Sequence, residues 1–140
     1  MNEINIYFED TEYFEIDRNK IETAIEKLII EESKMIGEVS VILCSDDYLL
    51  QINKQYLDHD YYTDIVTFDY VKDNIISGDL YISTDRIKEN AGKYDVDFSE
   101  ELYRVVFHGI LHLSGYDDKT DEEKDLIRSK ENYYIEKLVL

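Results

Sequence analysis

The chain has 140 residues and a formal net charge of −18, from 33 acidic and 15 basic side chains. This length predicts one domain, spanning residues 1–140. No apolar run approaches the roughly 20 residues that a membrane-spanning helix needs, and no basic segment followed by an apolar one marks an export signal at the N-terminus. We therefore expect a cytoplasmic protein without a membrane partner, and the negative charge counts against long-range attraction to nucleic acid.

The first half of the chain is predicted to alternate strands and helices. Residues 5–8 form a short apolar, β-prone strand, and Asp17 can cap a helix that ends near residue 34 or 35. Residues 38–45 are the strongest strand, being apolar and β-branched. Ser45, followed by two aspartates, then marks the start of a further helix, which gives way to a polar loop over residues 57–64.

The second half is predicted to begin with a hairpin and to continue as helices. Residues 64–70 and 79–83 form two strands, which we expect to pair in the antiparallel direction. Three helices follow: residues 84–94, a helix that starts at Asp97 with Glu100 completing a capping box and reaches Leu113, and residues 122–138. The acidic side chains of the last helix are interpreted as a solvated face. The predicted fold class is α+β, a four-stranded mixed β-sheet packed with about five α-helices.

The stretch HGILHLSGYDD, residues 108–118, indicates a metal site at the end of a core helix. Residues four apart on an α-helix differ by about 40° in direction, so His108 and His112 project side by side. Gly115 then allows the chain to reverse, which brings Asp118 back over the two imidazoles. Three protein ligands with an open fourth position are typical of a catalytic zinc site. Two histidines at this spacing also occur by chance on many helices.

The spacing of these residues matches the zinc-hydrolase pattern H-E-x-x-H-x-x-G-x-x-H, with Asp118 in place of the third histidine. A carboxylate is an accepted zinc ligand. A protease of that pattern has a glutamate directly after the first histidine as its general base, whereas this chain has Gly109. Peptide hydrolysis by that route is therefore disfavoured, and we expect the glycine to serve close packing.

The same stretch resembles the YbeY family of endoribonucleases, bacterial factors for ribosomal RNA maturation, whose signature is H-G-x-L-H-L-x-G-Y-D-H. The glycine after the first histidine is the residue of that family. Residues 52–68 (INKQYLDHDYYTDIVTF) are similar to its segment L-N-x-x-Y-R-x-x-D-x-x-T-D-V-L-S-F, and residues 78–83 (GDLYIS) are similar to G-D-I-x-I. The blocks follow the order of the family and together cover about residues 38–118.

This resemblance implies one Zn²⁺ per chain, held by His108, His112 and Asp118, the last through a substitution. It also implies an arginine that contributes to RNA cleavage at the position where this chain has Leu57. Leucine cannot fill that role. Our candidate for a catalytic replacement is Arg104, one helical turn before His108 and directed the same way. A surface ion pair with a neighbouring glutamate explains Arg104 equally well.

Other polar residues near these motifs have simpler interpretations. His59 lies in the acidic loop and is interpreted as a solvated histidine rather than a metal neighbour. Asn53 and Thr63 match family positions, and a side-chain hydrogen bond to the loop backbone would account for both.

The resemblance therefore implies a single-strand-specific, zinc-dependent endoribonuclease in rRNA maturation and ribosome assembly. Its expected partner is ribosomal RNA or a ribosomal subunit, reached through a ribosomal protein if the basic residues do not gather beside the site. One alternative is a metal-dependent hydrolase of peptides or small molecules, favoured by the ligand spacing. A second is a non-catalytic, zinc-stabilised ribosome assembly factor, favoured by Leu57 and by the negative charge.

Overall fold

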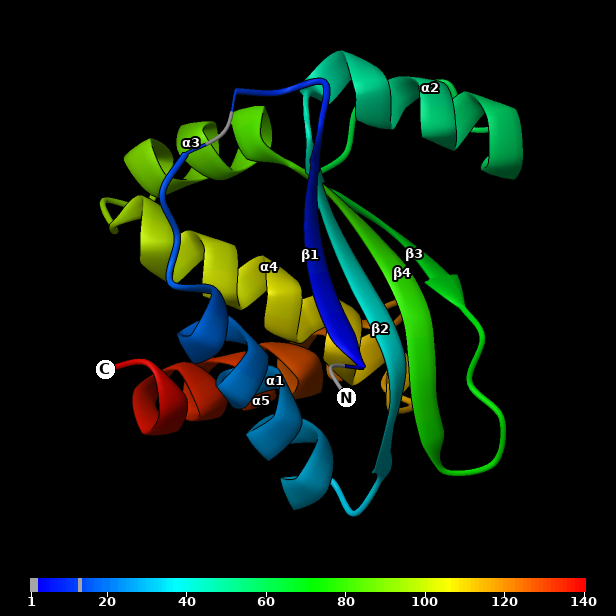
Figure 1. The fold of residues 1–140 in the computed structure, drawn as a ribbon, viewed down its shortest axis with the longest axis vertical. Coiled ribbons are helices and arrows are strands. Elements are labelled where there is room, and N and C mark those ends of the chain that lie inside the picture. The colour runs from blue at the N-terminus through cyan, green and yellow to red at the C-terminus, as the bar shows by residue number, and fades with distance from the viewer. Residues whose placement is uncertain (1–2, 13) are drawn as a thin grey trace.

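The computed structural model describes residues 3–12 and 14–140 and confirms the predicted α+β fold class (Figure 1). No helix in this described part is long and apolar enough to span a membrane. In chain order the elements are β1 (Ile4–Glu9), α1 (Arg18–Glu31), β2 (Met35–Cys44), α2 (Asp46–Leu57), β3 (Ile65–Asp69), β4 (Ile75–Ser83), α3 (Thr84–Lys93), α4 (Phe98–Leu113) and α5 (Asp121–Leu138).

The four strands form one mixed sheet in the order β1-β2-β4-β3. β1, β2 and β4 run parallel, and β3 pairs with β4 in the antiparallel direction, which confirms the predicted hairpin. Because side chains alternate along a strand, the two faces of this sheet carry different residues. Val41 and Leu43 of β2, with Leu80 and Ile82 of β4, are buried in the main core cluster.

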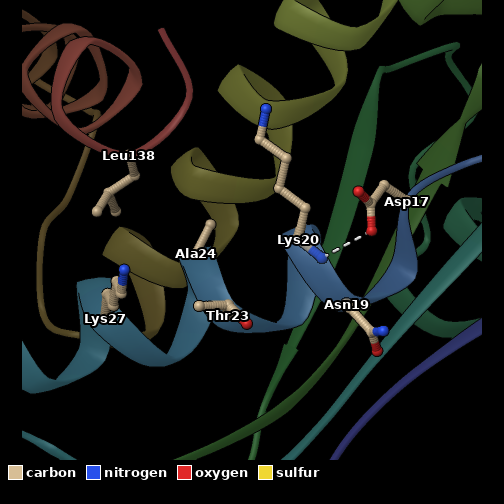
Figure 2. Close-up of a pocket in the computed structure, with 7 residues that line it drawn as sticks. All are labelled: Asp17, Asn19, Lys20, Thr23, Ala24, Lys27 and Leu138. Atoms are coloured by element: carbon tan, nitrogen blue, oxygen red, sulfur yellow. Dashed lines mark hydrogen bonds between the residues drawn. The ribbon is translucent and has the colours of Figure 1, made fainter.

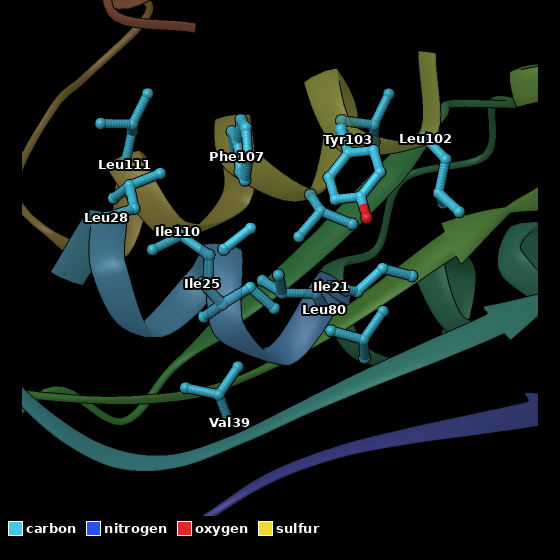
Figure 3. Packing of buried hydrophobic residues seen from close by; sticks show 14 of the residues in the cluster. Ile21, Ile25, Leu28, Val39, Leu80, Leu102, Tyr103, Phe107, Ile110 and Leu111 are labelled. Atoms are coloured by element: carbon cyan, nitrogen blue, oxygen red, sulfur yellow. The ribbon is translucent and has the colours of Figure 1, made fainter. Parts of the chain in front are cut away.

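That core cluster also takes in the apolar faces of α1 and α4, which lie over one face of the sheet (Figure 3). Ile25 and Leu28 of α1 and Phe107 and Ile110 of α4 are fully buried there. The opposite sheet face carries a smaller cluster in which Leu49 of α2 packs with residues of β2 and β3. α4, which carries both histidines of the motif, is therefore anchored along its length in the main core.

Three predicted boundaries differ from the structure by three residues or more, and one of them is the start of β4, which lies at Ile75 rather than at residue 79. α1 ends at Glu31 rather than near residue 34 or 35, because Ser33 takes a positive φ of 62° that ends the helical path. β2 accordingly starts three residues earlier than predicted, at Met35, whose backbone N–H donates to the carbonyl of Asn74.

The predicted capping box at the start of α4 is also wrong. Asp97 is the N-cap residue, but its side chain makes no capping hydrogen bond. A complete capping box occurs instead at α5, where Thr120 and Glu123 bond each other's backbone N–H groups.

Glu32, a half-buried carboxylate directly after α1, bonds to the segments that pack next to the metal motif. It accepts hydrogen bonds from the Tyr116 hydroxyl at 2.7 Å, from the Tyr134 hydroxyl, and from Lys130 Nζ at 3.3 Å. Burial by itself raises the pKa of Glu32, but the hydrogen bonds from Tyr134 and Tyr116 and the charge of Lys130 outweigh it, so the pKa is lowered. Glu32 thus joins α1 and α5 to the turn that follows α4.

We expect Glu32→Gln to lower the free energy of unfolding at neutral pH by about 1–3 kcal/mol, because hydrogen bonds to a charged group are lost. A lowered folded-state pKa means that the ionised form stabilises the fold at neutral pH. This contribution disappears as the pH falls below the ordinary glutamate pKa of about 4.3 and through the lowered folded value. Urea unfolding at several pH values measures the difference, with Glu26→Gln on the exposed face of α1 as control. A difference that stays constant into acid would contradict this account.

Candidate metal centre

The candidate ligands sit where α4 leaves the core and the chain turns towards α5. α4 ends at Leu113, and Gly115 follows with a φ of 111°, in the region that favours glycine, so the predicted reversal is confirmed. The turn brings Asp118 to the histidines: its Oδ2 lies 3.3 Å from His108 Nε2. The side chains of His108 and Asp118 are 28% and 45% exposed, so a ligand from solvent can reach this pair.

The Nδ1 atom of each imidazole lies within hydrogen-bonding distance of an acceptor oxygen. His108 Nδ1 lies 2.7 Å from Glu131 Oε2, and His112 Nδ1 lies 3.1 Å from the backbone carbonyl of Tyr116. A carbonyl oxygen and a carboxylate accept hydrogen bonds, so each Nδ1 is placed to donate, and Nε2 is the ring nitrogen left to face a metal ion. This is the arrangement that metal-binding histidines usually have. Two imidazole nitrogens and one carboxylate also match the donor chemistry of zinc.

A metal site is nevertheless not preformed in the structure. Within residues 3–12 and 14–140, no three His, Cys, Asp or Glu side chains converge as a metal-binding group. The assignment of His108, His112 and Asp118 as ligands therefore stays a prediction.

The electrostatic surroundings of His108 are acidic. Burial lowers its pKa, but the hydrogen bond and charge of Glu131, together with the charges of Asp118 and Asp64, outweigh burial and raise the pKa overall. A metal ion at Nε2 has to displace a proton, so its binding is expected to weaken in acid.

Two cavities meet at the candidate ligands. The first, of about 300 Å³, is bounded by His108, His112 and Asp118 on one side and by residues of α2, β3 and the loop between them on the other: Asn53, Leu57, His59, Tyr61, Thr63, Asp64, Ile65, Val66 and Thr67. The second, of about 270 Å³, lies on the other side of His108 and is lined by Arg104, Glu101, Arg128 and Glu131, among others. His108, Asp118 and Asp64 line both.

His59 is exposed, as expected of a solvated loop histidine, and it also lines the cavity of the candidate ligands. Its ring stacks on Tyr61 at a centroid distance of 5.2 Å, and the Tyr61 hydroxyl lies 3.0 Å from His59 Nδ1. The backbone-bonding roles expected for Asn53 and Thr63 are confirmed, since their side chains donate to the carbonyls of Tyr61 and Ile65.

Arg104, our candidate catalytic residue, borders the second cavity and is engaged by neighbouring side chains. Its Nη1 donates to Asn132 Oδ1 at 2.7 Å and lies 3.5 Å from Glu131 Oε1. Its Nε lies 3.9 Å from a carboxylate oxygen of Glu101. The ion pair predicted for Arg104 is therefore confirmed, but it does not lie on the surface. Glu101 and Glu131 are both buried, at 4% exposure.

Sequence reasoning missed Asp64 and Glu131. Asp64 belongs to a block shared with the family pattern, and that match was the available signal. The solvated face expected for the acidic side chains of the last helix does not include Glu131, which lies in the buried stripe of α5 with Ile127, Tyr134 and Ile135. A glutamate at an apolar position of an amphipathic helix was the signal that could have found it.

Gly109 explains why the protease glutamate is missing. A Cβ atom at this position would lie 2.8 Å from Leu80 Cδ2 and 2.9 Å from Ile65 Cδ1. α4 therefore approaches the sheet closely here, as expected, and a glutamate directly after the first histidine would have to displace Leu80 and Ile65.

A further cavity, at the start of α1, has no comparable chemistry (Figure 2). It measures about 420 Å³, and among its described lining residues Asp17 supplies the carboxylate. The Oδ1 atom of Asp17 already accepts the capping hydrogen bond from the Lys20 backbone N–H.

Comparisons with known proteins agree with the motifs. The sequence profile of the family described as Endoribonuclease YbeY matches residues 5–139. A protein named Endoribonuclease YbeY from Azobacteroides pseudotrichonymphae is 47% identical over 92% of this chain and 93% of its own length. One of the same name from Christiangramia forsetii is 48% identical over 95% and 92%.

A solved structure supports the same relationship. The solution structure of TM1509 from Thermotoga maritima superposes with a TM-score of 0.68 at 30% identity, covering 96% of this chain and 88% of that one. The profile, the curated relatives and the fold lead to one conclusion: the chain belongs to the YbeY endoribonuclease family.

Proposed function

We propose that this chain is an endoribonuclease that hydrolyses phosphodiester bonds of single-stranded RNA in rRNA maturation and ribosome assembly. The observation that carries the proposal is the pair of imidazoles, His108 and His112, each anchored at Nδ1 and lining one cavity with Asp118. The relatives named endoribonuclease identify RNA as the substrate class.

The proposed cofactor is one Zn²⁺ per chain, held by His108 Nε2, His112 Nε2 and a carboxylate oxygen of Asp118. When bound, such an ion polarises a phosphoryl oxygen and lowers the pKa of a bound water to about 7. The chain's own residues prepare the site: the Tyr116 carbonyl orients the imidazole of His112, and the close approach of α4 to the sheet at Gly109 holds both histidines in place.

The shape of the loop cavity favours single-stranded substrate. A phosphate must pass between the α2–β3 loop and α4 to reach the ligands, and unpaired RNA can bend its backbone into such a space more easily than a duplex. The stacked rings of His59 and Tyr61 at this cavity offer a surface on which an unpaired base can stack.

We further propose Arg104 as the catalytic cation in place of the family arginine, from the second cavity beside His108. A guanidinium there can stabilise the negative charge that develops on phosphoryl oxygens.

The net charge of −18 supports recruitment through a protein partner. Of the basic side chains that would have to offset this charge beside the site, Arg86 pairs with Asp46 at 3.1 Å, and Arg104 pairs with Glu101 and Glu131. We therefore propose that a ribosomal protein brings the chain to its rRNA, in the cytoplasm.

The non-catalytic assembly factor remains the second candidate, because Leu57 lines the ligand cavity where the family pattern has an arginine. Purified protein should be assayed against a single-stranded RNA, the matching duplex and a peptide, with and without a metal chelator, beside a ribosome-binding assay. We expect cleavage of the single strand alone and its loss with chelator. Ribosome binding without cleavage of any RNA would favour the assembly factor, and peptide cleavage would favour a protease.

A further inference from the structure

Glu131 is a buried carboxylate on α5, the helix that packs against α4. Its side chain is 5% exposed, and it lies 23 residues along the chain from His108. Burying a carboxylate costs several kcal/mol unless charged or hydrogen-bonding partners compensate. The contacts of Glu131 therefore indicate the role of this buried carboxylate.

The two oxygens of Glu131 face different partners. Oε2 lies 2.7 Å from His108 Nδ1, which is the shortest of its contacts. Oε1 faces the arginines: Arg104 Nη1 at 3.5 Å and Arg128 Nε at 3.9 Å. The arginines supply positive charge on one side of the carboxylate, and the other side remains as an acceptor for the imidazole.

We infer that Glu131 is a positioning residue of the metal centre. Its carboxylate accepts the hydrogen bond from His108 Nδ1 and so orients the ring with Nε2 facing Oδ2 of Asp118, 3.3 Å away and itself a proposed ligand. This inference rests on the proposed metal site. A carboxylate behind a histidine ligand fixes the ring orientation and raises the basicity of the ligand nitrogen. Arg104 pairs with the other oxygen of Glu131. A chain of polar contacts therefore runs from Arg104 on α4 through Glu131 on α5 to the proposed ligand His108.

The second histidine shows why Glu131 matters more than an ordinary buried ion pair. His112 is oriented by the backbone carbonyl of Tyr116, which no substitution removes. His108 depends on a side chain from another helix. The packing of α5 against α4 therefore sets the geometry of one ligand, and a change at Glu131 alters that ligand without touching the metal.

The test compares Glu131→Ala, Glu131→Gln and the control Glu101→Gln. Glu101 is equally buried at 4% and pairs with Arg104, and its described contacts include no histidine. Zn²⁺ affinity is measured by competition with a chromophoric chelator. We expect Glu131→Ala to weaken binding by about 10–100-fold, Glu131→Gln to weaken it less because its amide oxygen can still accept from Nδ1, and Glu101→Gln to bind like wild type.

Side-chain ¹H–¹⁵N spectra of the metal-free proteins, at alkaline pH where the imidazoles are neutral, provide a second readout. Wild type should show His108 with its hydrogen on Nδ1, and Glu131→Ala should shift the hydrogen towards Nε2. A wild-type His108 protonated at Nε2, or a folded Glu131→Ala that binds zinc as tightly as wild type, would overturn the inference. Wild type with the expected tautomer but no zinc binding would overturn the proposed metal site and leave the role of Glu131 towards His108 standing.

Discussion

Arg104→Lys is expected to reduce the rate of RNA cleavage by about 10²–10³-fold, the usual effect of losing one preorganised donor to a developing oxyanion. Lysine keeps the charge beside Glu131 but loses the planar fork that makes bidentate contacts with phosphoryl oxygens. Metal content at saturating zinc should stay near wild type, because Arg104 is not a proposed ligand. Single-turnover cleavage of a labelled single strand measures the rate.

A second variant restores the arginine that the family pattern has at the position of Leu57. Leu57→Arg in the Arg104→Lys background should recover part of the lost activity, because Leu57 lines the cavity of the ligands and an arginine there would reach the same phosphate. If Arg104→Lys cleaves RNA like wild type, the role of Arg104 is limited to its pairing with Glu101 and Glu131, and the catalytic assignment fails.

Gly78→Ala is expected to destabilise the fold by about 1–3 kcal/mol, the usual cost of overpacking. A Cβ atom there would lie 2.5 Å from the backbone carbonyl oxygen of Phe68 and 3.0 Å from the methyl groups of Leu113. The carbonyl belongs to the strand paired with β4, so it cannot move without disturbing the ladder. Leu113 directly follows His112, so the candidate site should be displaced as well.

Gly92→Ala is the matched control. No heavy atom lies within 4 Å of the added Cβ, and the residue is in α3. It should leave stability unchanged or raise it by about 0.4–1 kcal/mol. Urea unfolding of both variants tests the pair, and a Gly78→Ala protein as stable as wild type would show that the sheet and α4 can separate without cost.

Local patterns predicted most of the fold. The helical stripe of α1 and the apolar run of β2 are short-range signals, and the structure confirms both elements with shifted ends. The ends moved because Ser33 adopts a positive φ, which its identity does not reveal. The cap at Asp97 failed because the right residue type at the right position does not ensure that its side chain turns to the backbone.

The candidate site was predictable only in part for a related reason. His108, His112 and Asp118 lie within eleven residues, so helix geometry and one glycine turn suffice to bring His108 and Asp118 together. Glu131 and His59 reach His108 and its cavity from distant segments, through the packing of α5 on α4 and the path of the α2–β3 loop. These contacts depend on the whole fold. An acidic residue on a helix, or a histidine in a polar loop, gives no local sequence signal that predicts them.

The central claim is that RNA cleavage depends on a metal held by the two histidines. The most direct measurement is elemental analysis of the purified protein beside its cleavage of single-stranded RNA, for wild type and for the His108→Ala/His112→Ala double variant. We predict one divalent ion per wild-type chain, zinc by preference, and loss of both metal and cleavage in the double variant. Undiminished metal in the double variant, or RNA cleavage by wild type that contains no metal, would contradict the account.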